Sequence, residues 1–306
     1  MIVARTTCRL HLAGSVGQAW GISMSTRTIK LVVVGAMVAG TLVAESHKEW
    51  HFNVGPKAGV SVNNPYGSIS VKPSTNNTVV INAVLHSDKV EVDNRQNGNR
   101  VDVQSHLLPG ADATSGRVDY EVLVPADASV TLHSSTGPLR AEKLHGDVSL
   151  EGSGATVDVR DVVDAHVHVK TLTGPVTLSN IHDGHVEVDS LSGLVTMTGV
   201  TGQLVQVIST SGNIIYIGDF GSSGEYRLTS HSGDIEATVP ESTSADVSAR
   251  SVRGEVQDDI PLQPRSHNWF PLKQGSAFVG TMGKAASSVV LRTFSGKIHL
   301  KKRAEK

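Results

Sequence analysis

The sequence contains one cysteine, Cys8, and very few aromatic residues. A single cysteine cannot form an intrachain disulfide, and thiolate metal sites normally need several. Aromatic residues make up only 4% of the 306 residues, so we expect a core of valine, leucine, isoleucine and alanine rather than of rings. The G-x-S-x-G, H-E-x-x-H, Walker and dinucleotide-binding motifs are also missing. These absences exclude the most easily recognised hydrolase, metalloprotease and nucleotide-binding sites.

Acidic residues are missing from residues 1–44, which carry four basic ones. Met24–Lys30 is a short basic segment, and residues 31–44 (LVVVGAMVAGTLVA) form an apolar run shorter than the ~20 residues of a membrane-spanning helix. This pattern is typical of a secretory signal peptide cleaved after Ala44, with Met24 as the true start. Cys8 then lies outside the mature protein. An uncleaved membrane anchor is the alternative.

Charge is also unevenly distributed. Four of the 27 basic residues and none of the 29 acidic ones lie in residues 1–44, so the remainder has 23 basic and 29 acidic side chains, a net charge of −6. A nucleic-acid partner is not expected, because phosphate binding needs a concentrated basic surface. The basic residues near the C-terminus, including those of 301–306, are interpreted as a solvated tail.

A glycine-centred segment recurs along the second half of the chain. One copy is DSLSGLVTM at 189–197, and similar segments surround six other glycines. Successive copies are separated by about 20 residues, a period typical of solenoid repeats. A hydroxyl residue precedes each glycine by three positions and an apolar residue follows it by two, which predicts a tight turn and then a strand. We interpret the recurring glycines as structural turns: Gly137, Gly174, Gly193, Gly212, Gly233, Gly254 and Gly296.

A second series of apolar residues recurs at a constant step, at Val148, Val167, Val186 and Val205. The step equals that from Gly174 to Gly193. No sustained helical pattern accompanies it, so each period holds at least two short strands and no helix. Such a chain must coil back on itself and stack strand on strand.

The two series together predict the fold. We expect an all-β protein in which residues 131–300 form a single-stranded parallel β-solenoid (β-helix) of about eight coils. Right-handed winding is the general preference, although coils of this length also admit the left-handed form.

The segments beside the repeat are less regular. Residues 45–130 contain several strand-like segments, including an expected hairpin at 89–103, and we expect them to form a β-rich N-terminal cap over the open end of the solenoid. Residues 258–284 form an irregular insertion. It is interpreted as a loop whose aromatic residues cover an apolar flank or, alternatively, contact a ligand; these residues are Trp269, Phe270 and Phe278.

Several of these segments carry a family resemblance. They are Asn64–Val71, Tyr120–Pro125, Ser129–Leu132, the STG turn at 135–137, the later [ST]-G-x-[IV] turns, and TFSGKIHL at 293–300. Together they resemble the bacterial putative-adhesin family of β-strand-repeat proteins, a domain of unknown function, over about residues 60–300. The resemblance implies an exported envelope or surface protein with a β-solenoid fold. It supplies no established catalytic residues.

One group of outward-facing residues could carry chemistry. If Val167, Val169, Val186 and Val188 point inward, alternation along a strand turns His166, His168, His185 and Glu187 outward. The constant spacing of the coils places His185 beside His166 and Glu187 beside His168. Three imidazoles and a carboxylate suit Zn²⁺ or another borderline metal ion. A solvated polar face is the alternative, and no cofactor is otherwise expected.

Enzymatic activity receives less support from the sequence. A β-helix polysaccharide lyase or hydrolase needs several carboxylates converging from neighbouring coils. Here the position one period after Asp158 is Thr177, which is not a carboxylate. Asp161 and Asp164 belong with Arg160 to a charged turn, which is interpreted as solvated. We therefore predict a non-enzymatic exported protein of the bacterial envelope, in the periplasm or at the cell surface, that presents an adhesin-like surface to a glycan or another envelope protein. A membrane-tethered regulatory module and the polysaccharide-cleaving enzyme are the alternatives.

Overall fold

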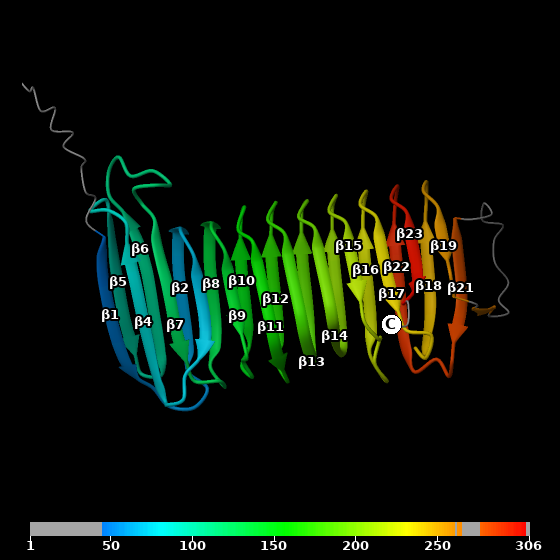
Figure 1. The fold of residues 1–306 in the computed structure, drawn as a ribbon, viewed down its shortest axis with the longest axis horizontal. Helices are drawn as coiled ribbons and strands as arrows, with labels where there is room; N and C mark the ends of the chain where they lie inside the picture. Colours follow the sequence, from blue (N-terminus) through cyan, green and yellow to red (C-terminus); the bar gives the residue numbers. More distant parts are fainter. Residues whose placement is uncertain (1–44, 261, 265–275, 304–306) are drawn as a thin grey trace, which may run out of the picture. The chain divides into compact units, whose positions relative to one another are not determined.

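The computed structural model describes residues 45–260, 262–264 and 276–303, and within these ranges every regular element is a β-strand. No helix in the described ranges is long and apolar enough to cross a membrane. The strands follow one another in an extended row (Figure 1). The predicted signal segment, Trp269, Phe270 and residues 304–306 of the tail lie outside the described residues.

Residues 166–217 form the regular middle of this row. They contain β12 (His166–Thr171), β13 (Val176–Ser190), β14 (Val195–Ser209) and β15 (Ile214–Ile217). Val167 pairs with Val186, and Val186 with Val205, both in parallel. Residues separated by this constant number of positions in the sequence therefore lie side by side on neighbouring strands, as the valine spacing predicts.

Each turn of the chain contributes one strand to each of two parallel ladders, and we call such a turn a coil. The first ladder contains, in order, β6 (Arg100–Leu107), β2 (Gly59–Tyr66), β8 (Ser129–Thr136), β10 (Val148–Gly152), β12, the ends of β13 and β14, β16 (Glu225–Ser230), β22 (Ser287–Thr293) and β18 (Ala245–Ser251). The second contains β7 (Val118–Val124), β3 (Ile69–Pro73), β9 (Leu139–Glu142), β11 (Val157–Val163), the starts of β13 and β14, β15, β17 (Ile235–Val239), β23 (Ile298–Lys302) and β19 (Val256–Asp258).

The core lies between the two ladders. Inward and outward residues alternate along each strand, as in β12, where Val167 and Val169 are fully buried while His166 and Lys170 are exposed. The same alternation is seen in β4 (Thr78–Leu85). Branched aliphatic residues fill most inward positions, because they fit a pleated surface that is covered on one side.

The expectation of a core without rings is wrong at two places. Tyr120 near the N-terminal end, and a cluster of Tyr216, Phe220 and Tyr226, are among the largest fully buried side chains. The Tyr216 and Phe220 rings stack with their centroids 4.8 Å apart. Phe220 comes from the turn between β15 and β16, where the chain takes a longer step from one coil to the next, since Val205 pairs with Tyr226. The longer turn supplies a ring, and low overall aromatic content does not reveal this local concentration.

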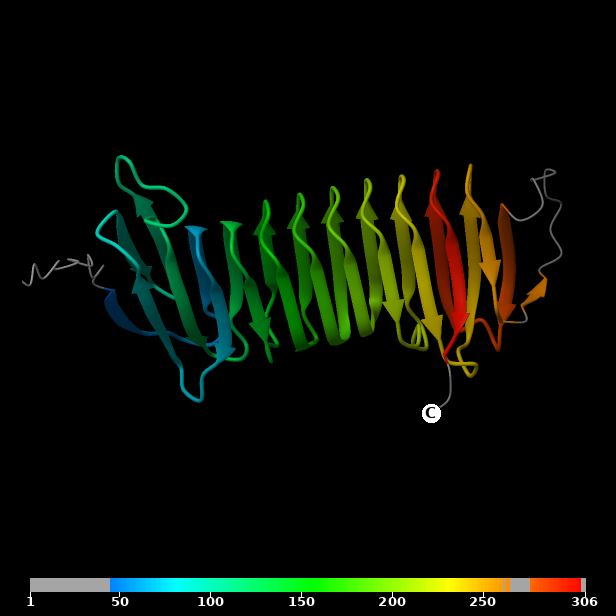
Figure 2. The ribbon, with the colours of Figure 1, turned by 45° about the horizontal axis from the view of Figure 1, so that its top comes forward.

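At the N-terminal end, a coil from early in the chain lies inside the stack. β2 pairs with β6 on one side and β8 on the other, and β3 lies between β7 and β9 (Figures 1 and 2). Residues 59–73 therefore form a coil of the ladders. The predicted boundary between cap and solenoid at residue 130 does not coincide with a change in the stack, because strand pairing there does not follow chain order.

Antiparallel strands cover the N-terminal end. β5 (Val90–Asn97) pairs with β6, which confirms the expected hairpin, while β4 pairs with β7 and β1 (Ser46–Asn53) pairs with β4. Antiparallel pairing ends the parallel stack and occupies the strand edges that β6 and β7 would otherwise expose.

A second inserted coil lies near the C-terminal end. β22 pairs with β16 and β18, and β23 pairs with β17 and β19, so residues 287–302 lie between the coils of 225–239 and 245–258. In Figure 2 these strands are red between yellow and gold neighbours. Gly233 and Gly254 are successive copies of the repeat in the sequence, yet they are not neighbours in the stack, because Gly296 lies between them.

The segment expected as an irregular insertion at 258–284 contains two further strands. β21 (Ala277–Met282) runs antiparallel to β18, and β20 (Gln263–Pro264) pairs with β21. β21 occupies the outer edge of β18 and so caps the first ladder at this end. The right-handed winding of the coils stays a prediction.

Candidate functional site

The recurring glycines form one column along an edge of the stack, which we call the glycine edge. The chain turns there from the first ladder to the second. A Cβ atom built on Gly193 would lie 2.0 Å from the carbonyl oxygen of Gly174, and one on Gly212 would lie 2.1 Å from that of Gly193. Real Cβ atoms do not approach backbone oxygens so closely. The glycines allow neighbouring coils to come together, which supports their interpretation as structural turns.

Buried hydroxyl groups accompany the glycines. The Oγ of Ser190 donates to the Gly193 carbonyl at 3.3 Å, and the backbone N–H of Gly212 donates to Ser209 Oγ at 2.9 Å. These bonds satisfy turn groups that water cannot reach. The buried polar residues of this column are Asn64 and the hydroxyl residues Ser105, Ser134, Thr171, Ser190, Ser209, Ser230, Thr293 and Ser251.

The outer surface of the glycine edge is unusually apolar. Among the described residues, each exposed large hydrophobic side chain lies in one of the glycine-containing turns or within two residues of such a turn. Their exposed fractions range from 42% to 54%; they are Leu172, Leu191, Leu194, Ile208 and Val252. Scattered exposed apolar residues need no explanation, but a row of them on one edge marks a surface suited to contact with another molecule.

The same edge carries an aromatic stack towards its C-terminal end. The rings of His231 and Phe294 lie parallel, with centroids 5.0 Å apart and an interplanar angle of 3°. The guanidinium carbon of Arg253 lies 4.8 Å from the centre of the Phe294 ring. These residues come from three neighbouring coils and meet because residues 287–302 are inserted between the other two. Sequence reasoning missed this cluster, since chain order does not predict the insertion.

Two further arginines flank the aromatic stack. Arg250 and Arg292 occupy paired positions on β18 and β22, and both are exposed. Among the described residues, no carboxylate forms an ion pair with either of them or with Arg253. Three guanidinium groups are therefore available to an anionic partner at this end of the glycine edge.

The predicted histidine patch lies on the outer face of the first ladder. His166 pairs with His185 and His168 with Glu187, which is the register expected from the constant spacing of the coils. Glu187 Oε2 lies 3.4 Å from His168 Nδ1 and 3.7 Å from His166 Nε2. The ligand atoms of these three residues all lie within 4.8 Å of one another.

His185 is close to this group without joining it. Its ring lies edge-on to the ring of His166, with centroids 6.1 Å apart, and it does not belong to the converging set. The structure therefore brings together three of the four predicted residues. Spacing places the backbone positions, but side-chain torsions decide which ring nitrogens converge.

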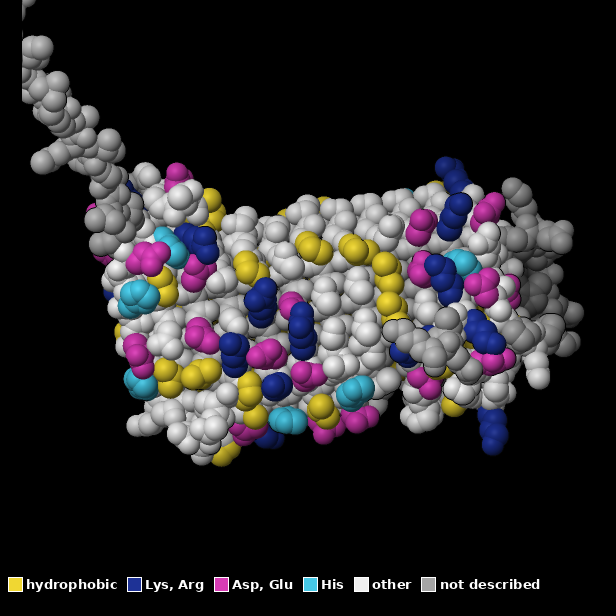
Figure 3. All heavy atoms as spheres, in the orientation of Figure 1, with side chains coloured by type: hydrophobic (Ala, Val, Ile, Leu, Met, Phe, Trp, Pro, Cys, Tyr) yellow, Lys and Arg dark blue, Asp and Glu magenta, His cyan; other side chains and the backbone are white. Residues whose placement is uncertain are grey.

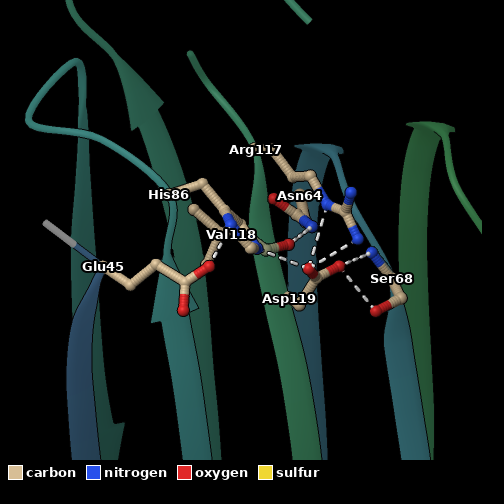
Figure 4. Close-up of polar contacts among 7 residues, drawn as sticks. All are labelled: Glu45, Asn64, Ser68, His86, Arg117, Val118 and Asp119. Atoms are coloured by element: carbon tan, nitrogen blue, oxygen red, sulfur yellow. Dashed lines mark hydrogen bonds and ion pairs between the residues drawn. The ribbon is translucent and has the colours of Figure 1, made fainter. Parts of the chain in front are cut away.

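A polar network at the N-terminal end was not predicted from the sequence. The Asp119 carboxylate accepts two hydrogen bonds from Ser68, one from Oγ at 2.7 Å and one from the Ser68 backbone N–H at 2.8 Å. The same carboxylate also contacts His86 and Arg117 (Figure 4). His86 Nδ1 lies 3.1 Å from Glu45. Burial alone would raise the pKa of the Asp119 carboxyl, but these donors together lower it to about 2.

The order of groups in this network is not that of a catalytic triad. A serine nucleophile is activated when its proton passes to a histidine that a carboxylate orients. Here Ser68 donates directly to Asp119, and His86 contacts the carboxylate from the other side. The network instead ties the start of β7 to the turn before β3 and to His86, which follows β4.

Charged side chains of both signs are scattered over the face shown in Figure 3. On the second ladder, a hollow of about 410 Å³ contains both signs of charge, and within it Arg160 Nε contacts Asp158 Oδ1 at 2.8 Å. Asp161 and Asp164, from the predicted charged turn, adopt positive φ angles of 55° and 54°. Asp161 lies within β11, at a position that the pairing with β13 skips, and Asp164 lies in the bend after this strand. Aspartate tolerates this conformation better than most residues.

The family model described as Toastrack DUF4097 matches residues 60–301. Among solved structures, the chain is similar to a "putative cell adhesion protein" from Clostridium sporogenes ATCC 15579, with 14% identity, a TM-score of 0.27, and coverage of 84% of this chain and 100% of that one. It is also similar to a "putative adhesin" from Bacteroides fragilis NCTC 9343, with 9% identity, a TM-score of 0.47, and coverage of 84% and 98%. The comparison with curated proteins finds no match.

Proposed function

Because the chain belongs to the Toastrack DUF4097 family, a family of unknown function, we propose its function from its own surface: it is a non-enzymatic, exported, adhesin-like protein whose glycine edge binds an acidic glycan of the cell envelope. In this proposal the coils form a single-stranded, right-handed β-solenoid that holds the edge rigid. The observation that carries the proposal is the concentration of exposed apolar side chains and of the His231–Phe294 stack on one edge.

The chemistry of the edge favours a sugar chain that carries negative charge. Phe294 packs between the His231 ring and the Arg253 guanidinium and so orders both groups. Guanidinium groups bind carboxylates in a planar, two-pronged geometry. The residues after the predicted signal carry a net charge of −6. Arg250, Arg253 and Arg292, which form no ion pair within the described part of the chain, therefore make a local positive area on an acidic protein. Such an area favours an acidic partner.

The length of the edge favours a repeating partner. Leu172 and Val252 lie five coils apart, about 24 Å at the ~4.8 Å spacing of neighbouring strands. Similar groups recur at each coil, so a polymer can form many weak contacts at once, and these together give useful affinity.

A binding experiment tests the proposal. Acidic polysaccharides such as polyuronates, and neutral dextran as a comparison, are immobilised and exposed to the full chain. Phe294→Ala and the double variant Arg250→Gln/Arg292→Gln are expected to lose about tenfold in affinity for the acidic polymers, the equivalent of ~1.4 kcal/mol. Arg140→Gln, an exposed arginine on the other ladder, is the matched control.

The outcome also separates the alternatives. Equal binding to dextran and polyuronate, or equal binding by all variants, contradicts the glycine edge as the site. New unsaturated or reducing sugar ends in the same incubations identify the polysaccharide-cleaving enzyme instead. N-terminal sequencing of the exported protein shows whether residues 31–44 are removed, which distinguishes a released protein from a membrane-tethered module.

A further inference from the structure

Three potential metal ligands converge on the outer face of the first ladder. His166 and His168 come from β12, and Glu187 comes from the last part of β13. The two histidines lie two residues apart on one strand, so they point to the same side, and the parallel register places Glu187 directly beside His168. Within the residues that the structure describes, this is the one group of three such side chains whose ligand atoms converge.

The separations in this group differ from those of hydrogen bonds. Glu187 Oε2 lies 3.4 Å from His168 Nδ1 and 3.7 Å from His166 Nε2, whereas N–H···O hydrogen bonds measure about 2.7–3.2 Å. Two ligand atoms bound to one Zn²⁺ at about 2.0–2.1 Å in a tetrahedral arrangement lie about 3.3–3.4 Å apart. The separation to His168 matches this spacing, and the separation to His166 exceeds it by about 0.3 Å, so a small side-chain movement brings the three atoms to the positions of ligands on one ion.

The backbone beneath the group is held firmly. Val167 and Val186, which pair across the two strands, are fully buried, and Val188 is 1% exposed. Each outward ligand thus follows or precedes a side chain anchored in the core. The N–H of His166 also donates to Asp147 Oδ1 at 3.1 Å, which links this position to the preceding coil. A site on such strands needs little rearrangement to accept an ion.

We propose that His166 Nε2, His168 Nδ1 and Glu187 Oε2 bind a borderline divalent cation, with Zn²⁺ as the best fit, and that water completes a four-coordinate site. Two imidazoles and one carboxylate match the donor types that Zn²⁺ takes, and they are too few in oxygen for Ca²⁺ or Mg²⁺. All three side chains are partly exposed, with side-chain exposures of 48%, 37% and 37%, so the ion can enter from solvent and keeps an open position. The bound ion joins β12 to β13. This inference does not depend on the proposed glycan binding.

Calorimetric titration of ZnCl₂ into the full chain, prepared without a polyhistidine tag, tests the site. One Zn²⁺ per chain is expected to bind. His166→Ala and Glu187→Gln are each expected to weaken binding more than about 100-fold, because loss of an outer-shell partner alone costs about 10–100-fold. A far-UV circular dichroism spectrum unchanged from wild type shows that these exposed substitutions leave the fold intact.

Two control variants make the result specific. His133→Ala removes a histidine whose Nδ1 lies 3.6 Å from Glu151 Oε2 on the same ladder, a pair without a third ligand, and should leave zinc affinity unchanged. His185→Ala should change it little, since His185 lies outside the converging group. Replacing Zn²⁺ with Co²⁺ should give the visible absorption bands of a tetrahedral site in wild type and not in Glu187→Gln.

Three results would overturn the proposal. No zinc binding by the wild-type chain excludes the site. Equal binding by wild type, His166→Ala and Glu187→Gln assigns the ion to other residues. A loss in His185→Ala or His133→Ala as large as that in His166→Ala shows that the stated ligand set is wrong.

Discussion

The middle of the stack and its two ends are built from the same kind of coil but joined in different ways. From β10 to β15 each coil contacts the coil that precedes it and the coil that follows it in the sequence. Near each end, a coil from a distant part of the chain lies between two others, as residues 59–73 and 287–302 do. The middle therefore rests on local repetition, whereas each end depends on contacts between remote segments.

The polar contacts in the middle of the stack also differ from those at its N-terminal end. In the middle, single hydroxyls such as Ser190 serve one turn each. At the N-terminal end, the buried Asn64 donates to the Val118 carbonyl at 2.7 Å and accepts from Ser105 Oγ, which also contacts the Tyr120 hydroxyl. Side chains that join remote segments thus form branched networks, because they must hold strands that chain connectivity does not bring together.

The largest effect is expected from removing the inserted C-terminal coil. A chain that ends at Ala286 lacks four buried side chains worth ~1.5–3 kcal/mol each, about 6–12 kcal/mol in all; they are Val289, Leu291, Ile298 and Leu300. Because the missing coil lies inside the stack, both of its neighbours lose a partner. Hydrogen exchange measured by mass spectrometry should show loss of protection throughout residues 225–258.

A chain that ends at Arg303 is the control for this truncation, and it should exchange like the full chain. Retained protection of residues 225–258 in the shorter chain would contradict the expectation, since it would mean that β16 and β18 can pair directly.

A smaller effect is expected from Gly193→Ala in the regular middle. The added Cβ would lie 2.0 Å from the Gly174 carbonyl oxygen, so neighbouring coils must separate, at a cost of about 2–3 kcal/mol. Gly154→Ala is the matched control on the same edge, because its nearest atoms lie 3.7 Å and 3.8 Å away; its effect should stay within about 0.5 kcal/mol. Urea denaturation midpoints give both values. Equal destabilisation by the two changes would show that close coil approach is not the role of Gly193.

The smallest effect is the pH dependence that Asp119 contributes at the N-terminal end. The pKa of this carboxyl falls from 3.8 to about 2 in the folded chain, so its stabilising contribution is complete above about pH 4 and is lost as the pH falls towards 2. Partial exposure to solvent reduces the contribution to about 1 kcal/mol. Urea midpoints of wild type and Asp119→Asn should therefore differ at pH 5 and converge near pH 2.

Asp88→Asn, at an exposed aspartate, is the control for this measurement and should follow the wild type at both pH values. A constant difference between wild type and Asp119→Asn from pH 5 to pH 2 would mean that the Asp119 network stabilises the fold without its charge.

The sequence predicts well whatever depends on neighbouring repeats. Alternation and a constant period give the register of Val167, Val186 and Val205, and they bring His166, His168 and Glu187 onto one face. These features need only the geometry of a pleated strand and a constant step.

Features that depend on remote pairing could not be predicted. The turn around Gly296 has the same form as those around Gly233 and Gly254, so nothing in it indicates that it lies between them. The contact of Arg253 with Phe294 follows from that insertion and was missed with it. His185 stands apart from the metal-ligand group because side-chain torsions, which spacing does not specify, direct its ring elsewhere.

The place of residues 287–302 also sets an order for folding. The coils of 225–239 and 245–258 leave the ribosome first, yet β18 and β19 cannot adopt their final positions until the last coil enters between them. Until then β16 and β18 expose unpaired edges that other chains can join. Pairings over such long sequence separations form slowly. Completion of this end of the molecule therefore waits for the final strands to be synthesised, and a chaperone that shields the two open edges would protect the chain during that interval.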